Sequence, residues 1–361
     1  MLAFPKGILL ELTHRCPLHC PYCSNPIELI RKAQELSADI WLSVIEQAAQ
    51  LSVQQLHFSG GEPLLYPNIL HLLQKASDLG VYANLITSGI NLTSTVAKNL
   101  KKTGIPHVQL SIQGPGTAYD LTLSGYKKAF EHKSRAVSAL LTENISVTIN
   151  WVMCRQNIDA LPEVLAQVLD WGVPRLELAM TQYHGWAHLN RAALFPTAEQ
   201  VHKAEQEIIR AQKKHRGHLV IDYVPSDYAL SIPKPCMGGW GQKLMVINPQ
   251  GEVLPCHMAK LLPLTFENVH EKTLLDIWQH SSAFNQYRGT DWMPMPCKTC
   301  PQKTIDWGGC RCQAFALTGD ASATDPVCRY APTHALTQIA NLASPTQLPQ
   351  FRGQHFRKKK L

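Results

Sequence analysis

Three cysteines near the start of the chain are the residues best suited to chemistry. Cys16, Cys20 and Cys23 follow an apolar run at residues 7–13, and Pro17 and Pro21 exclude a regular helix between them. The thiols therefore lie on a loop at the end of a strand. Three thiolates can hold three irons of a four-iron cluster and leave the fourth iron open to another ligand. A zinc half-site or reduced core thiols fit the same residues, and the spacing alone does not separate these interpretations.

A second motif, Ser59-Gly60-Gly61-Glu62-Pro63, follows the next apolar run. Two glycines let the backbone approach a ligand closely, and the carboxylate of Glu62 can take an ammonium group, although an ordinary glycine turn is the simpler interpretation of the motif alone. Small polar residues end the later apolar runs, where they suit recognition of a ribose and a carboxylate but are also common at strand ends. They are Ser88, Ser111, Gln113 and Asn150.

A stretch rich in aromatic and histidine side chains occupies residues 181–191. Tyr183, His184 and His188 follow a predicted strand end, where they can form a substrate wall and take part in proton transfer. A buried core position is the simpler account of any one of them taken singly.

Seven further cysteines gather in the last third of the chain: Cys236, Cys256, Cys297, Cys300, Cys310, Cys312 and Cys328. Their spacing fits zinc sites and iron–sulfur sites equally. No apolar segment is long enough to span a membrane, and the start of the chain is too short for a signal peptide. We therefore expect a soluble, cytoplasmic protein in which most of the 11 cysteines bind metal rather than form disulfides.

The composition is that of a globular protein with a large core. The 361 residues are 45% hydrophobic and 17% charged, with a formal net charge of +7. Part of that charge lies in the basic stretch at residues 356–360, and no segment resembles a nucleic-acid-binding module.

The elements that must position these residues follow an α/β rhythm up to residue 224. We expect strands at 7–13, 55–59, 82–87, 107–112, 146–153, 175–181 and 218–224, and helices at 39–51, 67–79, 93–103, 125–143, 159–171 and 197–215. Consecutive β/α units imply a parallel sheet. We therefore predict a partial (β/α)6 TIM-type barrel whose chemistry lies at the C-terminal ends of the strands.

The rhythm stops beyond residue 224, where a proline-rich stretch predicts a linker at 225–235. A β-hairpin at 244–254 and a helix at 273–288 follow. We divide the chain into a barrel at 1–224, the linker, a cysteine-rich domain at 236–335 and a flexible tail at 336–361.

The C-x3-C-x2-C spacing, with Tyr22 before the last cysteine, resembles the signature of radical S-adenosylmethionine (radical SAM) enzymes. The Gly60-Gly61-Glu62-Pro63 block resembles the GGEP motif of that family. The resemblance implies a 4Fe-4S cluster on Cys16, Cys20 and Cys23, whose open iron chelates S-adenosyl-L-methionine (SAM) and whose electron cleaves it to a 5′-deoxyadenosyl radical. It further implies that SAM is bound by Gly60, Gly61, Glu62, Pro63, Ser88, Ser111, Gln113 and Asn150.

The C-terminal cysteines resemble the SPASM extension of radical SAM enzymes, which binds two auxiliary iron–sulfur clusters. Asp306 stands where the SPASM pattern has a cysteine, and Cys312 is an addition to it. Through these departures and the blocks at 185–192 and 309–315, the chain resembles the radical SAM/SPASM enzymes of pyrroloquinoline quinone (PQQ) biosynthesis. The resemblance covers roughly residues 7–330. The resemblance assigns Cys236, Cys256, Cys310 and Cys312 to auxiliary cluster I, and Cys297, Cys300, Asp306 and Cys328 to auxiliary cluster II.

That family resemblance implies a peptide cyclase, an oxidoreductase that joins a glutamate and a tyrosine side chain of the precursor peptide PqqA by a carbon–carbon bond. It implies as partners the peptide chaperone PqqD and an electron donor such as flavodoxin, and neither nucleic acid nor membrane. Two alternatives are another SPASM peptide-modifying enzyme, sulfatase-maturing or thioether-forming, and a non-catalytic zinc-binding protein. Asp306 and Cys312 argue against the first.

Overall fold

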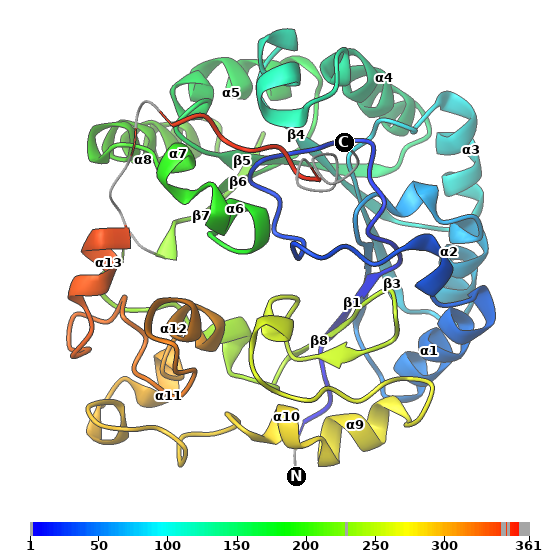
Figure 1. Ribbon diagram of the computed structural model, residues 1–361. Coiled ribbons are helices and arrows are strands. Elements are labelled where there is room, and N and C mark those ends of the chain that lie inside the picture. Colours follow the sequence, from blue (N-terminus) through cyan, green and yellow to red (C-terminus); the bar gives the residue numbers. More distant parts are fainter. Residues whose placement is uncertain (1–2, 228–229, 341–343, 345–346, 354–361) are drawn as a thin grey trace, which may run out of the picture.

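Seven parallel strands stand side by side in chain order in this computed structural model, which describes residues 3–227, 230–340, 344 and 347–353 (Figure 1). Each strand pairs with the next one along the chain. The strands are β1 (Gly7–Glu11), β2 (Gln55–Ser59), β3 (Tyr82–Thr87), β4 (His107–Ile112), β5 (Ser146–Met153), β6 (Arg175–Met180) and β7 (Val220–Val224). All seven lie within the predicted runs.

Helices cover the outer face of this curved sheet (Figure 1). The principal ones are α1 (Ala38–Gln50), α2 (Ile69–Asp78), α3 (Ser94–Lys102), α4 (Ala129–Thr142), α5 (Leu161–Asp170) and α8 (Ala198–Lys214). The short α6 (Gly185–Leu189) and α7 (Arg191–Leu194) follow β6, and α6 lies against the loop of the N-terminal cysteines. Strand β7 forms one edge of the sheet, and the sheet does not close. The predicted partial barrel is thereby confirmed.

The two faces of the sheet differ in polarity. Outward side chains such as Leu10, Phe58 and Leu110 are fully buried against the helices, as period-two alternation requires. The inner face carries a polar row in which the imidazole of His107 bonds to Asn84 Oδ1 (2.7 Å) and Thr148 Oγ1 (2.8 Å). Apolar burial thus fixes the strands, and the inner face is left for polar groups.

Local signals explain several helix ends. Ser37 accepts a hydrogen bond from the backbone of Ile40 at the start of α1, and Thr197 forms a capping box with Gln200 at the start of α8. Helix α4 begins at Ala129 rather than 125, because Asp120–Ser124 form a π-helical turn and Gly125 then reverses the chain at φ +66°.

The C-terminal region extends the same sheet. Strand β8 (Leu244–Ile247) pairs in parallel with β1, and β9 (Val253–Leu254) pairs antiparallel with β8, which confirms the predicted hairpin. The single helix predicted at 273–288 is wrong: it is divided into α9 (Leu274–His280) and α10 (Ser282–Asn285), because Ser281 leaves the helical conformation and caps the second piece. The helices α11 (Lys303–Asp306), α12 (Arg311–Thr318) and α13 (Ala335–Ala340) complete this region.

The segment predicted as a flexible tail is partly packed. Helix α13 begins one residue before it and forms its first turn, and residues 347–353 run back beside the loop of the three N-terminal cysteines (Figure 1). Hydrogen bonds between Gln350 and Asn190, and between Arg352 and His19, hold this stretch against the body of the protein. The basic residues predicted to end the tail, 356–360, lie outside the described residues.

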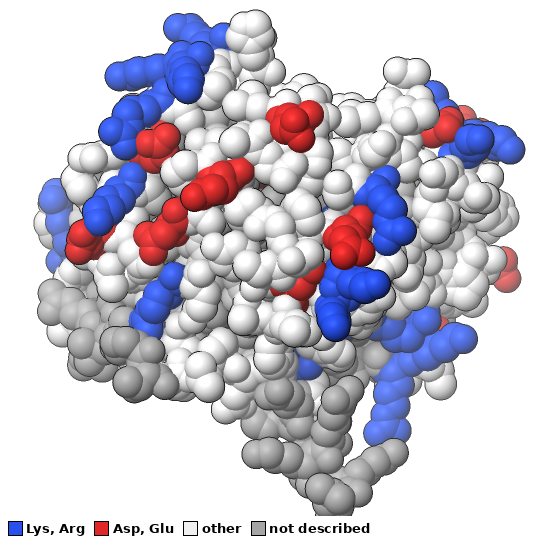
Figure 2. Space-filling model, turned by 90° about the horizontal axis from the view of Figure 1, so that it is seen from above, with Lys and Arg blue, Asp and Glu red and all other residues white. Residues whose placement is uncertain are grey.

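No helix in the described part of the chain is long and apolar enough to cross a membrane. On the face drawn in Figure 2, Lys and Arg are interspersed with Asp and Glu, in agreement with the modest net charge.

Candidate active site

The three N-terminal cysteines lie on the loop after β1 and line one cavity of about 210 Å³. The backbone N–H groups of His19 and Trp186 donate to Ser124 O (2.7 Å) and Cys23 O (3.0 Å), which fixes the loop against the barrel. Burial raises the pKa of the Cys16 and Cys20 thiols to about 12. The loop therefore presents protonated thiols that a metal would have to deprotonate on binding.

Glu62 is fully buried and joins the GGEP loop to the end of β3. Its carboxylate accepts hydrogen bonds from Thr87 Oγ1 (2.7 Å) and from the backbone and hydroxyl of Ser88 (2.8 and 2.5 Å). A fourth bond comes from the backbone N–H of Leu64 (3.1 Å). These donors satisfy a buried carboxylate and position Ser88 at the cavity. The predicted contact of Glu62 with an ammonium group stays a prediction.

Gly60 and Gly61 allow the GGEP loop to lie directly on the cysteine loop. A Cβ at Gly60 would stand 2.3 Å from Thr13 O, and one at Gly61 would stand 2.3 Å from Arg15 O. Backbone hydrogen bonds join the two loops, from Gly61 N to Thr13 O (2.5 Å) and from Glu62 N to Arg15 O (2.7 Å). Both glycines also line the cavity. Close packing of two loops is thus a second reason for the glycine pair.

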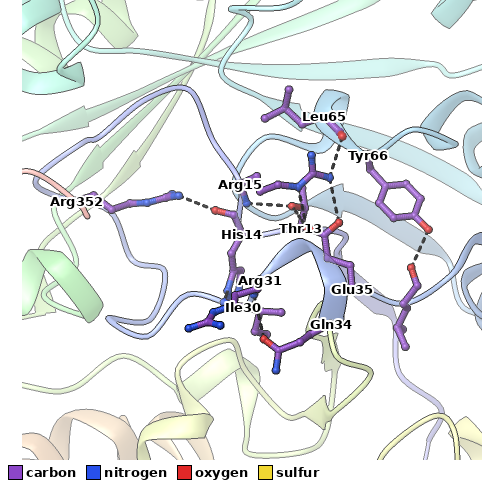
Figure 3. A network of polar contacts seen from close by, with 11 residues as sticks. Thr13, His14, Arg15, Ile30, Arg31, Gln34, Glu35, Leu65, Tyr66 and Arg352 are labelled. Carbon is purple, nitrogen blue, oxygen red and sulfur yellow. Dashed lines mark hydrogen bonds and ion pairs between the residues drawn. The ribbon is translucent and has the colours of Figure 1, made fainter. Parts of the chain in front are cut away.

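Arg15 strengthens the same junction through its side chain. Its guanidinium forms two hydrogen bonds to Glu35 (2.9 and 3.0 Å) and one to Leu65 O (3.0 Å), as Figure 3 shows. The cysteine loop is therefore tied to the segment before α1 and to the turn after the GGEP motif.

The predicted polar residues at strand ends do not all reach this cavity. Ser88, Ser111 and Gln113 line it, and the amide of Gln113 donates to Tyr22 Oη (3.0 Å) and to Cys20 Sγ (3.9 Å). Asn150 lies deeper in the barrel, where it donates to Glu177 (3.0 Å). Pro63 is buried at the start of a 3-10 turn. Their contacts with SAM stay predictions.

Lys133 is a site residue that sequence analysis missed. It projects from α4 and donates to the carbonyl oxygens of Ser88 (2.7 Å) and Ser111 (2.5 Å), at the ends of neighbouring strands. Burial lowers its pKa to about 8, although nearby Cys20 and Glu62 oppose that shift. A lysine in an amphipathic helix ordinarily faces solvent, and its sequence context gives no sign of this position.

Four C-terminal cysteines form one group. The Sγ atoms of Cys256 and Cys312 are 3.8 Å apart. The thiols of Cys236 and Cys312 hydrogen-bond to Cys310 and hold its pKa well below the usual range. The structure therefore brings together the four residues assigned to auxiliary cluster I.

The other four assigned residues form a second group. Burial raises the pKa of the Cys297 and Cys328 thiols, and the charge of Asp306 raises both further. Cys300 adds to the shift at Cys328, and Asp306 itself is buried and accepts a bond from the backbone of Gly308 (2.9 Å). The partition of these eight residues between two clusters, and their binding of clusters, stay predictions.

The donor sets fit iron–sulfur clusters. In the described ranges no three His, Cys, Asp or Glu side chains lie close enough to share one metal ion. All but one of the predicted ligands are thiols, the ligand type that clusters prefer.

A larger cavity of about 420 Å³ adjoins the first C-terminal cysteine group. His184 lines it together with Cys236, Cys256 and Cys310, and burial lowers the pKa of His184 to about 4. Tyr183 instead packs in the core and stacks on Phe195 (ring centres 5.3 Å apart). His188 is not among the residues that line this cavity. Of the three predicted wall residues, His184 is the one placed at the cavity.

Asp325 and Gln313 are two further residues of this cavity that sequence analysis missed. Asp325 accepts hydrogen bonds from the backbone of Cys310 (2.7 Å) and from the amide of Gln313 (2.8 Å). Burial raises the pKa of Asp325 to about 6. An Asp before a proline commonly marks a turn, so the sequence offers no signal for this role.

Comparisons with known families agree with this geometry. Residues 10–168 match the Radical SAM superfamily, and residues 236–301 match the SPASM iron–sulfur cluster-binding domain. The chain is therefore a radical SAM enzyme with a SPASM domain, which uses SAM and iron–sulfur clusters. This class leaves no basis for the alternative of a non-catalytic zinc-binding protein.

Curated relatives narrow the class to one family. A PqqA peptide cyclase of Rhizobium meliloti (strain 1021) is 48% identical over 97% of this chain and 94% of its own length. One of Gluconobacter oxydans (strain 621H) is 47% identical over 91% of this chain and 92% of its own length. The chain belongs to the PqqA peptide cyclase family.

Solved structures share the fold at low sequence identity. Streptococcus suis SuiB bound to S-adenosylmethionine has a TM-score of 0.77 at 19% identity, covering 91% of this chain and 78% of SuiB. SuiB bound to the precursor peptide SuiA gives 0.75 at 19% identity, covering 91% and 77%. Native anSMEcpe with bound AdoMet gives 0.61 at 17% identity, covering 93% and 96%.

Proposed function

We propose that this enzyme joins the side chains of a glutamate and a tyrosine in the precursor peptide PqqA, by a carbon–carbon bond, during PQQ biosynthesis. The observation that carries the proposal is the 48% identity to a PqqA peptide cyclase over nearly the whole of both chains. The alternatives of a sulfatase-maturing or thioether-forming enzyme have no comparable support.

Cys16, Cys20 and Cys23 would hold the cluster that binds SAM, with Gly60, Gly61, Ser88 and Gln113 around it. When bound, the cofactors would supply a 5′-deoxyadenosyl radical that would take one hydrogen atom from the glutamate side chain. The two groups of C-terminal residues would each hold one auxiliary cluster. We therefore propose three clusters in all.

The tyrosine ring must lose one proton and one electron after the new bond has formed. Burial lowers the pKa of His184 to about 4, which keeps its imidazole neutral but makes it a weak base, so we propose that it takes the proton only from the strongly acidic oxidised ring. Cys236, Cys256 and Cys310, three of the four cysteines assigned to auxiliary cluster I, line the cavity of His184, and a cluster there would accept the electron. This placement gives a physical reason for a second domain beside the barrel.

Two partners complete the proposal. A small peptide substrate has little surface of its own, and we propose that the chaperone PqqD presents it and that a flavodoxin-type donor supplies electrons. The fold is shared with SuiB, one structure of which contains a precursor peptide, and this likeness supports a peptide substrate.

The test is incubation of anaerobically purified enzyme with PqqA, PqqD, SAM and reductant, followed by mass spectrometry of the peptide. We expect a product that is lighter by two hydrogens and carries a Glu–Tyr cross-link, and no product from the Cys16→Ala/Cys20→Ala/Cys23→Ala variant. The matched control is Cys154→Ala, which removes a buried thiol outside the three groups and should keep activity. A thioether product, or an unmodified peptide with fully loaded enzyme, would contradict the proposal.

Omitting PqqD from the same reaction tests the chaperone. We expect the amount of product to fall at least tenfold, and PqqD to bind the enzyme in isothermal titration calorimetry. Full activity without PqqD, together with no measurable binding, would remove this partner from the proposal.

A further inference from the structure

Residues 347–353 return from the end of the chain to the loop of the three N-terminal cysteines. The backbone N–H of Arg352 donates to His19 O (3.1 Å), and the ring of His19 bonds back to Arg352 O (3.0 Å). The backbone N–H of Gln350 donates to Asn190 Oδ1 (2.7 Å), and Asn190 Nδ2 donates to Gln350 O (2.8 Å). Asn190 Nδ2 also donates to Pro21 O (2.9 Å). Backbone and side-chain bonds therefore hold this segment between the loop and α6.

The side chain of Arg352 enters the cysteine site. It is 6% exposed and lines the cavity of Cys16, Cys20 and Cys23. Nη2 donates to His14 O (2.6 Å), as Figure 3 shows, and Nη1 lies 3.8 Å from Cys23 Sγ. The His14 carbonyl thus fixes the plane of the guanidinium with one edge toward the Cys23 sulfur.

Arg352 lacks an anionic partner among the described carboxylates. None of the ion pairs found in the described residues includes it, and its Nε is buried without a hydrogen-bond partner. An unpaired buried cation is costly, and this site therefore favours a negatively charged group beside the cysteines.

We propose that Arg352 is a positioning residue of the first cluster site, whose charge and hydrogen bond to the Cys23 sulfur raise the reduction potential of the cluster held by Cys16, Cys20 and Cys23. This inference rests on the proposed function. Hydrogen bonds to cluster sulfurs and nearby positive charge both stabilise the reduced, more negative state. The end of the chain would thus make the first cluster easier to reduce.

The test is a redox titration of anaerobically reconstituted full-length enzyme, followed by electron paramagnetic resonance. The signal of the first cluster is the one that the Cys16→Ala/Cys20→Ala/Cys23→Ala variant loses. We expect Arg352→Gln to shift the midpoint of that signal to a lower potential, and Arg352→Lys to shift it less. The matched control, Arg31→Gln, removes an exposed arginine and should leave the midpoint of the first cluster unchanged. The midpoints of the auxiliary clusters should stay at their wild-type values in all three arginine variants.

The outcomes separate this inference from the proposed function. A fully loaded Arg352→Gln enzyme with the wild-type midpoint would overturn the role of Arg352 and leave the proposed function intact. Loss of the first cluster in Arg352→Gln but not in Arg352→Lys would support the need for the charge, whereas loss in both would overturn it. A wild-type enzyme without a cluster on Cys16, Cys20 and Cys23 would instead contradict the proposed function.

Discussion

At the scale of single residues, Gly61 sets how closely the GGEP loop approaches the cysteine loop. Its added Cβ would meet backbone, which cannot rotate away, so Gly61→Ala must separate the two loops. We expect a loss of about 1–3 kcal/mol in the free energy of unfolding, together with a smaller amount of iron bound at the first cluster site. Anaerobic reconstitution followed by iron analysis and the electronic spectrum would measure the second effect.

Gly80→Ala is the matched control for this change. Gly80 has φ +70° at the end of α2 and nothing within 4 Å of an added Cβ, so alanine there should cost about 1 kcal/mol and leave the iron content unchanged. If Gly61→Ala loaded as much iron as Gly80→Ala, close packing of the two loops would not be what the site requires.

Residues that act through spacing along the chain were predictable. Short motifs contain Cys16, Cys20, Cys23 and the glycine pair, so the spacing of these residues is enough to predict their role. Lys133, Asp325 and Arg352 reach their sites from a helix, a turn and the C-terminal segment. Their local sequence does not predict these positions, because only tertiary packing brings the three residues to the cysteines.

At the scale of elements, the polar row on the inner face of β2 to β5 makes the barrel sensitive to acid. Burial lowers the pKa of His107 from 6.5, and the charges of Arg175 and His57 lower it further. The unfolded chain therefore binds more protons at His107 between the lowered pKa and about 6.5. Its contribution to stability is complete above about pH 6.5 and is lost as the pH falls below that value.

Thermal unfolding of wild type and His107→Gln at about pH 7.5 and about pH 5.5 would measure this contribution. We expect the midpoint temperature to fall less on acidification in the variant, because the variant has no proton to take up at this position. The control variant His202→Gln changes an exposed position of α8, and its midpoint temperature should fall as much on acidification as that of wild type. An equal fall in all three proteins would place the acid sensitivity elsewhere.

Elements with strong apolar patterns were predicted well, and those defined by turns were not. In β2, β4 and β6, buried apolar residues alternate with less buried ones, which fixes both the type of each element and its buried face. The break at Ser281 depends on a hydrogen bond from its hydroxyl to Glu267 (2.5 Å), and the late start of α4 depends on a π-helical turn. Neither feature alters the apolar periodicity that the prediction used.

At the scale of the whole molecule, the barrel and the cysteine-rich region share one sheet. Strand β1 has β2 on one side and β8 on the other. Helix α9 adds a hydrogen bond from Leu274 N to Gln47 of α1 (2.8 Å), and Trp278 bonds to the carbonyl of Ala3 (2.9 Å). The proposed boundary at 225–235 therefore separates two sequence regions that complete each other's core.

A fragment of residues 1–235 should accordingly fold poorly. Its β1 would present an unpaired edge, and the surface beneath α9 would be exposed, both of which favour aggregation. We expect most of this fragment in the insoluble fraction after expression. A fragment of residues 1–289, which keeps β8, β9, α9 and α10, should be more soluble. Equal solubility of the two fragments would show that the barrel folds without these four elements.

The packing of Arg352 beside Cys23 also has a consequence for the order of events during synthesis. The two residues are 329 positions apart, which at 5–20 residues per second is roughly 15 to 65 s of translation. Throughout that interval the nascent cysteine loop has no C-terminal segment over it. Cluster carriers therefore have their widest access to these thiols before the ribosome has finished the chain.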